Sequence, residues 1–309
     1  MIENPAAIEA DNLSKTFSGG LAAVSGLDLS VPAGVVYGLV GRNGAGKTTL
    51  IRMLMGLLRP TGGTGRILGR DLWDSDPSQR QRIGYVSQMH KAHEWMTISE
   101  LCRYLWHFYE KWDQPYARSL AKRFDLPWDR QIGLLSGGEQ RKAAILLAFA
   151  ARPEVLMLDE PAAGLDPIAR RELIDETVDV IAGVSPCTVF FSTHILSDLE
   201  RVAEYVGIMD RGRIVTEAKL DDLQNRTKRV QVVFNSDAIP DGFEIPGAIR
   251  TKVEGPVVTS VVRMVSETQL DELHKRPDLR VNVFPLGLEE IFIDLFGPEA
   301  RGEFGDMRL

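Results

Sequence analysis

Residues 35–58 read VVYGLVGRNGAGKTTLIRMLMGLL, and this stretch decides the fold. Its first six residues, 35–40, form an apolar and β-rich run, which is typical of a strand buried on both faces. Glycine then occupies three of the next six positions, and residues 49–58 suit a helix. Glycines let backbone N–H groups approach an anion closely, and a helix N-terminus adds positive potential. The succession of strand, loop and helix therefore predicts a phosphate-binding site.

Residues 41–48 match G-x-x-x-x-G-K-[ST], the P-loop pattern. In this pattern the Lys47 side chain reaches the β- and γ-phosphates of a nucleotide, and the Thr48 hydroxyl can bind Mg²⁺. A chance glycine-rich turn is the alternative, and the flanking strand and helix argue against it. The predicted nucleotide-binding residues of this segment are Gly41, Arg42, Asn43, Gly44, Ala45, Gly46, Lys47, Thr48 and Thr49.

A second apolar run, residues 155–158, ends in the acid pair Asp159-Glu160. Carboxylates are seldom placed at the end of a buried strand without a task. Beside a P-loop, Asp159 is predicted to hold Mg²⁺ through water, and Glu160 to act as the general base that polarises an attacking water. For the acid pair taken by itself, a solvated helix N-cap is the alternative.

Residues 135–140 read LSGGEQ, a Ser-Gly-Gly turn before a helical run that extends to Ala150. Ser136 suits the N-cap position, and the helix N-terminus behind it is open to an anion. A plain N-cap remains the alternative for this turn in isolation. This turn lies between the P-loop and the acid pair, and few protein families combine all three segments in this order.

With these motifs in this order, residues 5–220 resemble the nucleotide-binding subunit of an ABC transporter. The resemblance implies that the signature of one chain completes the ATP site of a second chain, so that two chains hold two ATP molecules head to tail. It implies catalytic roles for Lys47, Glu160 and His194, the last as the switch histidine at the γ-phosphate. The matching signature residues are Ser136, Gly137, Gly138 and Glu139.

The same resemblance assigns three further positions. Gln88 matches the Q-loop glutamine, which contacts Mg²⁺, so that the implied metal-binding set is Thr48, Gln88 and Asp159. Asp166 matches the D-loop aspartate, and Phe17 matches the aromatic residue that stacks on adenine. The cofactors implied are ATP and Mg²⁺.

Two departures from the family pattern leave every catalytic group in place. Glu139 stands where glutamine is commoner and adds a negative charge near a phosphate site, which would weaken nucleotide capture slightly. Residues 161–163 lack the hydroxyl groups often found before the D-loop. We therefore expect an active ATPase.

The fold expected is an α/β P-loop NTPase of the ABC type, with a RecA-like parallel sheet, an antiparallel β subdomain and a helical subdomain at about residues 89–150. Within it, Leu101, Leu105, Phe108 and Trp112 recur at helical spacing over residues 99–124 and predict one apolar helix face. The aromatic residues of the region that could contact a membrane partner are Trp95, Trp106, Tyr109 and Trp112.

Residues 221–309 are predicted to form a small C-terminal α/β domain. Three strands, at residues 230–234, 257–265 and 281–284, and two helices, at residues 268–275 and 288–296, are expected there. This portion resembles the domain appended to ATPase subunits of bacterial exporters, which favours export over import.

Charge and hydropathy limit the partners. The formal net charge is −7, so the chain lacks the broad positive field that nucleic-acid binding requires. No apolar run reaches the roughly 18 residues of a membrane span, and no basic segment followed by an apolar core marks a signal peptide. The expected partners are a membrane-spanning permease and a second ATPase chain, in a homodimer or heterodimer, at the cytoplasmic face of the cell membrane.

Two other functions fit parts of the sequence. A soluble ABC ATPase that remodels DNA or ribosomes is the alternative, although such relatives usually carry two cassettes or long coiled coils, and this chain has neither. A regulatory module that binds ATP without turnover is a third possibility. Glu160 and His194 argue against it.

Overall fold

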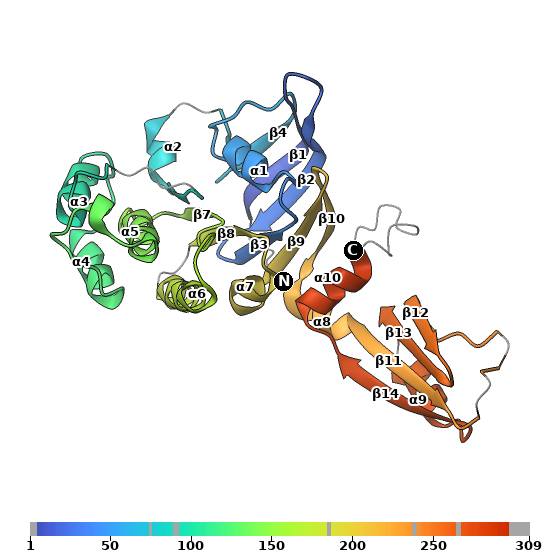
Figure 1. Ribbon diagram of the computed structural model, residues 1–309. Coiled ribbons are helices and arrows are strands. Elements are labelled where there is room, and N and C mark those ends of the chain that lie inside the picture. The colour runs from blue at the N-terminus through green and yellow to red at the C-terminus, as the bar shows by residue number, and fades with distance from the viewer. Residues whose placement is uncertain are drawn as a thin grey trace. The chain divides into compact units, whose positions relative to one another are not determined.

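The computed structural model describes residues 5–73, 76–88, 93–183, 187–236, 239–240, 242–263 and 267–296 (Figure 1). The chain divides into two compact units, residues 1–217 and residues 218–309. The sequence predicts a domain boundary at residue 220.

A six-stranded sheet with the order β10-β9-β3-β8-β7-β6 forms the centre of the first unit. Its strands are β6 (Ile83–Val86), β7 (Val155–Asp159), β8 (Thr188–Thr193), β3 (Val36–Val40), β9 (Tyr205–Asp210) and β10 (Arg213–Lys219). From β6 to β9 all neighbours run parallel. Every residue of β3, β7 and β8 is buried, as their continuous apolar runs predict. Because carboxyl ends of parallel strands share one edge, the residues that follow these strands gather there.

A second sheet in this unit is antiparallel throughout and has the order β2-β1-β4-β5. Its strands are β1 (Ala6–Thr16), β2 (Ala22–Pro32), β4 (Gly62–Ile67) and β5 (Arg70–Asp71). The apolar sides of β1 and β2 share one core with helix α1 (Lys47–Leu54) and with residues of β3 and β7. The helix that carries the end of the P-loop is therefore held between the two sheets.

The remaining helices of the first unit are α2 (Pro77–Gln81), α3 (Ile98–Trp106), α4 (Gln114–Arg123), α5 (Gly137–Ala150), α6 (Pro167–Ala182) and α7 (Leu196–Val202), with a 3₁₀ turn at Ile132–Leu134. Helices α3, α4 and α5 gather at one side of the unit (Figure 1). Helices α6 and α7 pack against each other, and α7 packs on β3.

Residues 99–124 are largely helical, but the prediction that Leu101, Leu105, Phe108 and Trp112 share one helix face is wrong. Helix α3 ends at Trp106, and α4 begins at Gln114 with the Asp113 carboxylate accepting a hydrogen bond from the backbone of Tyr116. Pro115 at the start of α4 has no N–H to donate into a preceding turn, so a new helix begins there. Phe108 consequently lies in the connection and is 53% exposed instead of facing the core.

The second unit has a four-stranded antiparallel sheet of order β12-β13-β11-β14. Its elements are α8 (Leu220–Arg226), β11 (Thr227–Phe234), β12 (Ala248–Glu254), β13 (Val257–Arg263), α9 (Glu267–His274), β14 (Leu279–Pro285) and α10 (Leu288–Phe296). Alternate residues of β11, β13 and β14 form its own apolar core. Strand β12 was not predicted from the sequence: it is an edge strand in which five of the seven residues are exposed, and its apolar pattern is correspondingly weak.

The predicted fold class is confirmed: a parallel core sheet, an antiparallel sheet and a group of helices make up the first unit, and a small α/β unit follows. Among the described residues, no helix combines the length and the apolar character needed to cross a membrane.

Candidate nucleotide site

The loop between β3 and α1 depends on glycine at two close approaches. Gly46 is the N-cap of α1 with φ 110°, a conformation that other residues rarely adopt. A Cβ on Gly46 would lie 2.3 Å from the Ala23 carbonyl oxygen, and one on Gly41 would lie 2.4 Å from that of Met209. The sequence pattern therefore reflects a real steric need, because the loop is pressed against neighbouring backbone at both ends.

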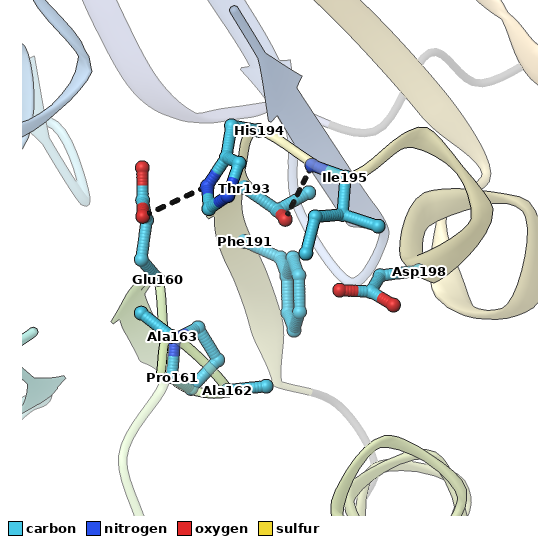
Figure 2. Close-up of a pocket in the computed structure, with 9 residues that line it drawn as sticks. All are labelled: Glu160, Pro161, Ala162, Ala163, Phe191, Thr193, His194, Ile195 and Asp198. Atoms are coloured by element: carbon cyan, nitrogen blue, oxygen red, sulfur yellow. Dashed lines mark hydrogen bonds and ion pairs between the residues drawn. The ribbon is translucent and has the colours of Figure 1, made fainter. Parts of the chain in front are cut away.

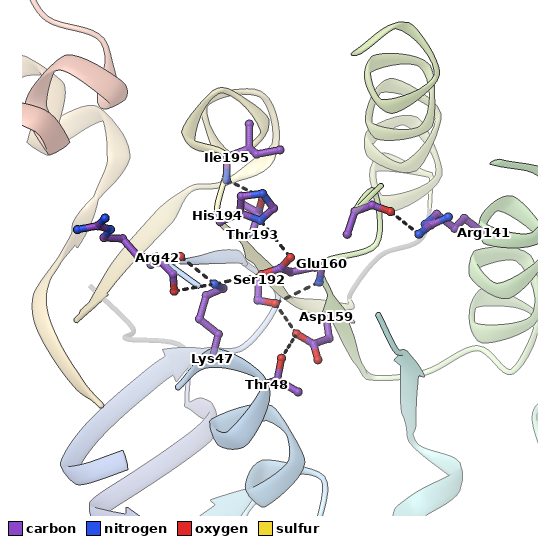
Figure 3. Close-up of polar contacts among 12 residues, drawn as sticks. Arg42, Lys47, Thr48, Arg141, Asp159, Glu160, Ser192, Thr193, His194 and Ile195 are labelled. Atoms are coloured by element: carbon purple, nitrogen blue, oxygen red, sulfur yellow. Dashed lines mark hydrogen bonds and ion pairs between the residues drawn. The ribbon is translucent and has the colours of Figure 1, made fainter. Parts of the chain in front are cut away.

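Lys47 is buried at the start of α1, with 5% of its surface exposed. Its Nζ donates to the Gly41 carbonyl at 2.8 Å and lies 3.1 Å from Oε1 of Glu160 (Figure 3). A buried ammonium requires anionic or carbonyl partners, and here both lie within the loop and at the end of β7. Any phosphate that binds Lys47 competes with Glu160 for this ammonium.

Asp159 ends β7 and is 1% exposed. Its Oδ1 accepts hydrogen bonds from the Thr48 hydroxyl at 3.2 Å and the Ser192 hydroxyl at 2.8 Å. Its Oδ2 is buried and has no hydrogen-bond partner in the part of the chain that the structure describes. Burial raises the pKa of this carboxyl group, and the two hydroxyl donors oppose that rise.

Glu160 and His194 follow neighbouring parallel strands. His194 Nδ1 lies 3.0 Å from Oε2 of Glu160, and Lys47 holds the other carboxylate oxygen. The Glu160 backbone has φ 49°, a left-handed conformation that is uncommon outside glycine. Its N–H donates to the Ser192 carbonyl at 3.0 Å, which fixes this strained turn.

A small pocket of about 10 Å³ lies beside this pair, close to the least volume that holds one water molecule. Figure 2 shows Glu160 and the segment after it on one side, and residues from β8 and α7 on the other. The lining residues are Glu160, Pro161, Ala162, Ala163, Phe191, Thr193, His194, Ile195 and Asp198.

The Ser-Gly-Gly turn forms a capping box at the N-terminus of α5. The Ser136 hydroxyl accepts from Glu139 N–H at 3.2 Å, and the Glu139 carboxylate accepts from Ser136 N–H at 2.7 Å. These bonds lower the pKa of Glu139, so it is charged at neutral pH. No hydrogen bond or ion pair joins residues 136–139 to the P-loop within the described parts of the chain.

Asp166 caps the next helix, α6, and one arginine of α5 contacts the segment before it. Its Oδ1 accepts from the backbone N–H of Ile168 and of Ala169, both at 3.0 Å, at the start of α6. Arg141 on α5 donates to the Gly137 carbonyl at 3.3 Å and also to the Ala163 carbonyl. The signature helix is therefore tied directly to the segment between Glu160 and Asp166.

The other predicted site residues are mostly exposed. Gln88 is exposed and lies two residues after β6, and residues 89–92 next to it lie outside the described residues. Phe17 follows β1 and is 39% exposed, with Lys15 Nζ 5.5 Å from its ring centroid. Arg42, Asn43 and Gly44 are exposed in the loop, Ala45 is buried and Thr49 is half-buried on α1.

Two polar residues in this region were not predicted from the sequence. Ser192 is buried in the apolar strand β8 and bonds to both acids of the β7 end, through Oδ1 of Asp159 and the backbone of Glu160. Asp198 lines the pocket from α7. A hydroxyl residue at the end of an otherwise apolar strand, next to Thr193-His194, was the available signal for Ser192. No signal in the sequence marks Asp198.

Known proteins resemble the chain along most of its length. A family model described as "ABC transporter" matches residues 24–163. The daunorubicin/doxorubicin resistance ATP-binding protein DrrA of Streptomyces peucetius is 32% identical, over 95% of this chain and 93% of the relative. The Nod factor export ATP-binding protein I of Cupriavidus pinatubonensis is 31% identical, over 92% of this chain and 89% of the relative.

Among solved structures, one described as the structure of an ATP binding subunit of an ABC transporter superposes with a TM-score of 0.63 and 28% identity, covering 71% of this chain and 92% of the other. The chain also carries what nucleotide hydrolysis needs: a phosphate-binding loop, a buried lysine and two carboxylates at one sheet edge. The chain therefore belongs to the ABC transporter family, as an ATP-binding subunit with ATPase activity.

Proposed function

We propose that this chain is the motor of an exporter: it pairs with a second ATPase chain and drives transport through a separate membrane permease, on the cytoplasmic face of the membrane. ABC ATP-binding subunits work with membrane permeases and dimerise. The names of the two relatives above refer to drug resistance and to export, and this supports export rather than remodelling of a soluble complex.

One observation carries the chemistry: the Glu160 carboxylate is held between Lys47 and His194, at 3.1 and 3.0 Å. In the proposed reaction ATP draws the Lys47 ammonium toward its phosphates and leaves Glu160 free to accept a proton. A water molecule attacks the γ-phosphorus, its proton passes to Glu160, and the bond to the β-phosphate oxygen breaks to release ADP. In this proposal His194 orients Glu160, with which it is in contact, and binds the γ-phosphate.

The donor set at the end of β7 fits Mg²⁺. Asp159 has a buried oxygen that lacks a partner among the described residues and shares its other oxygen with the Thr48 hydroxyl, and Mg²⁺ prefers oxygen ligands of this kind. Bound there with ATP, the ion would neutralise charge that develops on the phosphates. Gln88 is proposed as a further ligand, and Phe17 as the residue that stacks on adenine.

The signature is proposed to act on the ATP of a second chain. In one chain the N-terminus of α5 makes no bond to the P-loop among the described residues, and its Ser136 and Gly137 are exposed and available to a partner. A helix N-terminus of this kind attracts phosphate. Two chains in head-to-tail symmetry would thus complete two equal sites.

Mixing two inactive variants tests this arrangement. Lys47→Ala removes the phosphate-binding ammonium, and Gly137→Asp places a carboxylate in the signature where a Cβ meets only Arg141, at 3.6 Å. If sites are shared, the mixed dimer has one intact site, and equal mixing should restore roughly a quarter of wild-type ATPase activity. No recovery from stably mixed dimers would contradict the shared site.

We propose that the permease docks on the exposed aromatic residues near α3. Trp95 and Trp106 are 67% and 59% exposed, and the rings of Tyr104 and Phe108 pack at a tilt with centroids 5.1 Å apart. Trp112, a candidate from the sequence, is buried and is excluded from this surface. Affinity purification of the chain from membranes should recover a multi-span protein, and Trp95→Ala with Trp106→Ala should weaken the recovery. Recovery of ribosomes instead would favour the soluble alternative.

A further inference from the structure

Two ion pairs join helices α6 and α7, and they differ in burial. Arg170 on α6 lies with Nε 3.4 Å from Oδ1 of Asp198 on α7, and the Asp198 side chain is only 8% exposed. Asp175 on α6 pairs with Arg201 on α7 at 2.9 Å, and the Asp175 side chain is 48% exposed. The two helices are thus linked once next to the pocket and once at the surface.

The buried pair joins the two segments that carry Asp166 and His194. Arg170 follows Asp166, the cap of α6, by four residues, and Asp198 follows His194 by four residues. Asp198 lines the same pocket as Glu160 and His194 (Figure 2). Its backbone N–H donates to the Ile195 carbonyl at 3.3 Å, while Ile195 N–H donates to the Thr193 hydroxyl at 3.0 Å. Asp198 therefore lies in the first turn of α7, directly after the short turn that carries His194.

The charges around Asp198 make Arg170 its main partner. Burial raises the pKa of Asp198, and Arg170, then His194, the Thr193 hydroxyl and Arg201 act in the opposite direction. Arg170 opposes the rise in the pKa of Asp198, and removal of one partner of a buried pair leaves the other poorly compensated. Breaking a buried pair costs more free energy than breaking an exposed pair, which contributes little.

We propose that the Arg170–Asp198 ion pair is a positioning device, which holds the turn of residues 193–195 so that His194 reaches Glu160 and which transmits any shift of the Asp166 end of α6 to that turn. The proposal rests on the proposed roles of Glu160 and His194. Neither Arg170 nor Asp198 touches the reacting atoms in it. Their effect reaches the chemistry through His194.

The test compares four variants of the full chain: Asp198→Asn, Arg170→Gln, the double variant, and Asp175→Asn as the matched control on the same helix pair. Turnover and KM for ATP are measured, together with the NMR signals of the imidazole rings in histidine-labelled protein. The His194 signal is identified by its loss in His194→Ala.

We expect Asp198→Asn and Arg170→Gln each to move the His194 signal. Each should lower kcat roughly tenfold while KM changes less than about twofold, because misplacing a positioned group lowers the rate more than it weakens binding. The double variant should be no worse than either single variant, because the two residues act as one unit. Asp175→Asn should change neither signal nor kcat.

An unmoved His194 signal in both single variants would overturn the proposal, as would an equal effect of Asp175→Asn. A failure of the proposed function gives a different result. In that case His194→Ala keeps wild-type turnover although the His194 signal still moves in Asp198→Asn.

Discussion

The charged side chains at the end of β7 are costly to bury. Lys47, Asp159 and Glu160 are each less than 10% exposed, and together they carry one more negative than positive charge when ionised. Burial of unpaired charge destabilises a fold, so such a group is more readily understood as a binding site than as a stabilising feature. Asp159 is the least compensated member, because one of its oxygens has no hydrogen-bond partner among the described residues.

Asp159→Asn should therefore stabilise the protein in the absence of nucleotide. Burial raises the pKa of Asp159 above its ordinary value of 3.8. Protonation of Asp159 therefore stabilises the fold. This stabilisation is fully present below the ordinary pKa and is lost as the pH rises through the raised pKa. At pH 7 the variant should melt about 2–4 °C above wild type, which corresponds to about 1 kcal/mol for a chain of this size.

Thermal unfolding at pH 7 measures this difference, and Asp210→Asn, at the half-exposed end of the parallel strand β9, is the control. The control should show no gain, and the gain of Asp159→Asn should shrink toward acidic pH. Addition of Mg²⁺ and ATP should stabilise wild type more than the variant. A variant that melts below wild type at pH 7 would show that the carboxylate stabilises the fold.

Glu160→Gln should bind ATP and barely hydrolyse it. The amide cannot accept the proton, which should lower turnover by at least about 100-fold. The change also removes the anion that competes for Lys47, so ATP affinity should stay equal or rise. Phosphate release and nucleotide titration measure the two effects. Glu154→Gln, just before the same strand, is the control and should keep its turnover per folded molecule; wild-type turnover in Glu160→Gln would refute the assigned base.

At the scale of elements, helix α5 is proposed to bind phosphate at its N-terminus, where the positive charge of the helix dipole is partly cancelled by Glu139. The Glu139 carboxylate closes the capping box on Ser136 and thereby stabilises the first turn. The same negative charge opposes the positive end of the helix dipole. Glutamate at this position therefore favours the helix but disfavours a phosphate group bound at its N-terminus.

Glu139→Gln should strengthen ATP capture without loss of the cap. The glutamine oxygen can still accept from Ser136 N–H, while the charge is gone, and removing a charge at a helix end changes the binding energy by about 0.3–1 kcal/mol. We expect KM for ATP to fall by about two- to fivefold at low salt and to approach wild type at high salt, because salt screens the repulsion. Glu139→Ala loses the cap bond as well and should melt lower than Glu139→Gln. An unchanged or higher KM in Glu139→Gln at low salt contradicts this role.

Elements with a clear periodic or continuous pattern were predictable, and those set by their neighbours were not. Strands β3, β7 and β8 are buried on both faces and are evident from their apolar runs. The edge strand β12 has mostly exposed residues and gives no such pattern. The break between α3 and α4 was missed although Asp113 and Pro115 mark it, because the apolar spacing across it imitates a helix.

The site shows the same division. The P-loop and the acid pair each consist of consecutive residues, so the sequence pattern alone predicts them. The contacts of Asp159 with Ser192 and of Arg170 with Asp198 join residues about 30 positions apart. The first contact depends on β7 and β8 being neighbours in the sheet, and the second on α6 packing against α7. A single sequence states neither arrangement.

At the scale of the whole molecule, the two units have separate cores. The main core cluster of the first unit draws its buried residues from Ala7 to Met209, and the core of the second unit draws them from Val230 to Val281. Strand β11 pairs only with β13 and β14 among the described strands, and the sheet to which it belongs contains none of the strands β1 to β10. The last strand of the first unit, β10, is complete at Lys219.

A chain that ends at Lys219 should therefore fold and hydrolyse ATP without the second unit. It retains both sheets, the P-loop and every residue of the proposed site, and a core of this size is enough for a cooperative fold. Urea unfolding should show one cooperative transition, and ATPase activity should stay within about threefold of the full chain. A chain that ends at Arg211 is the matched control. It lacks β10, so that β9 becomes the edge strand of the sheet, and it should aggregate. If the chain that ends at Lys219 aggregates as well, the second unit is needed to fold the first, and the separation of the two cores does not extend to their stability.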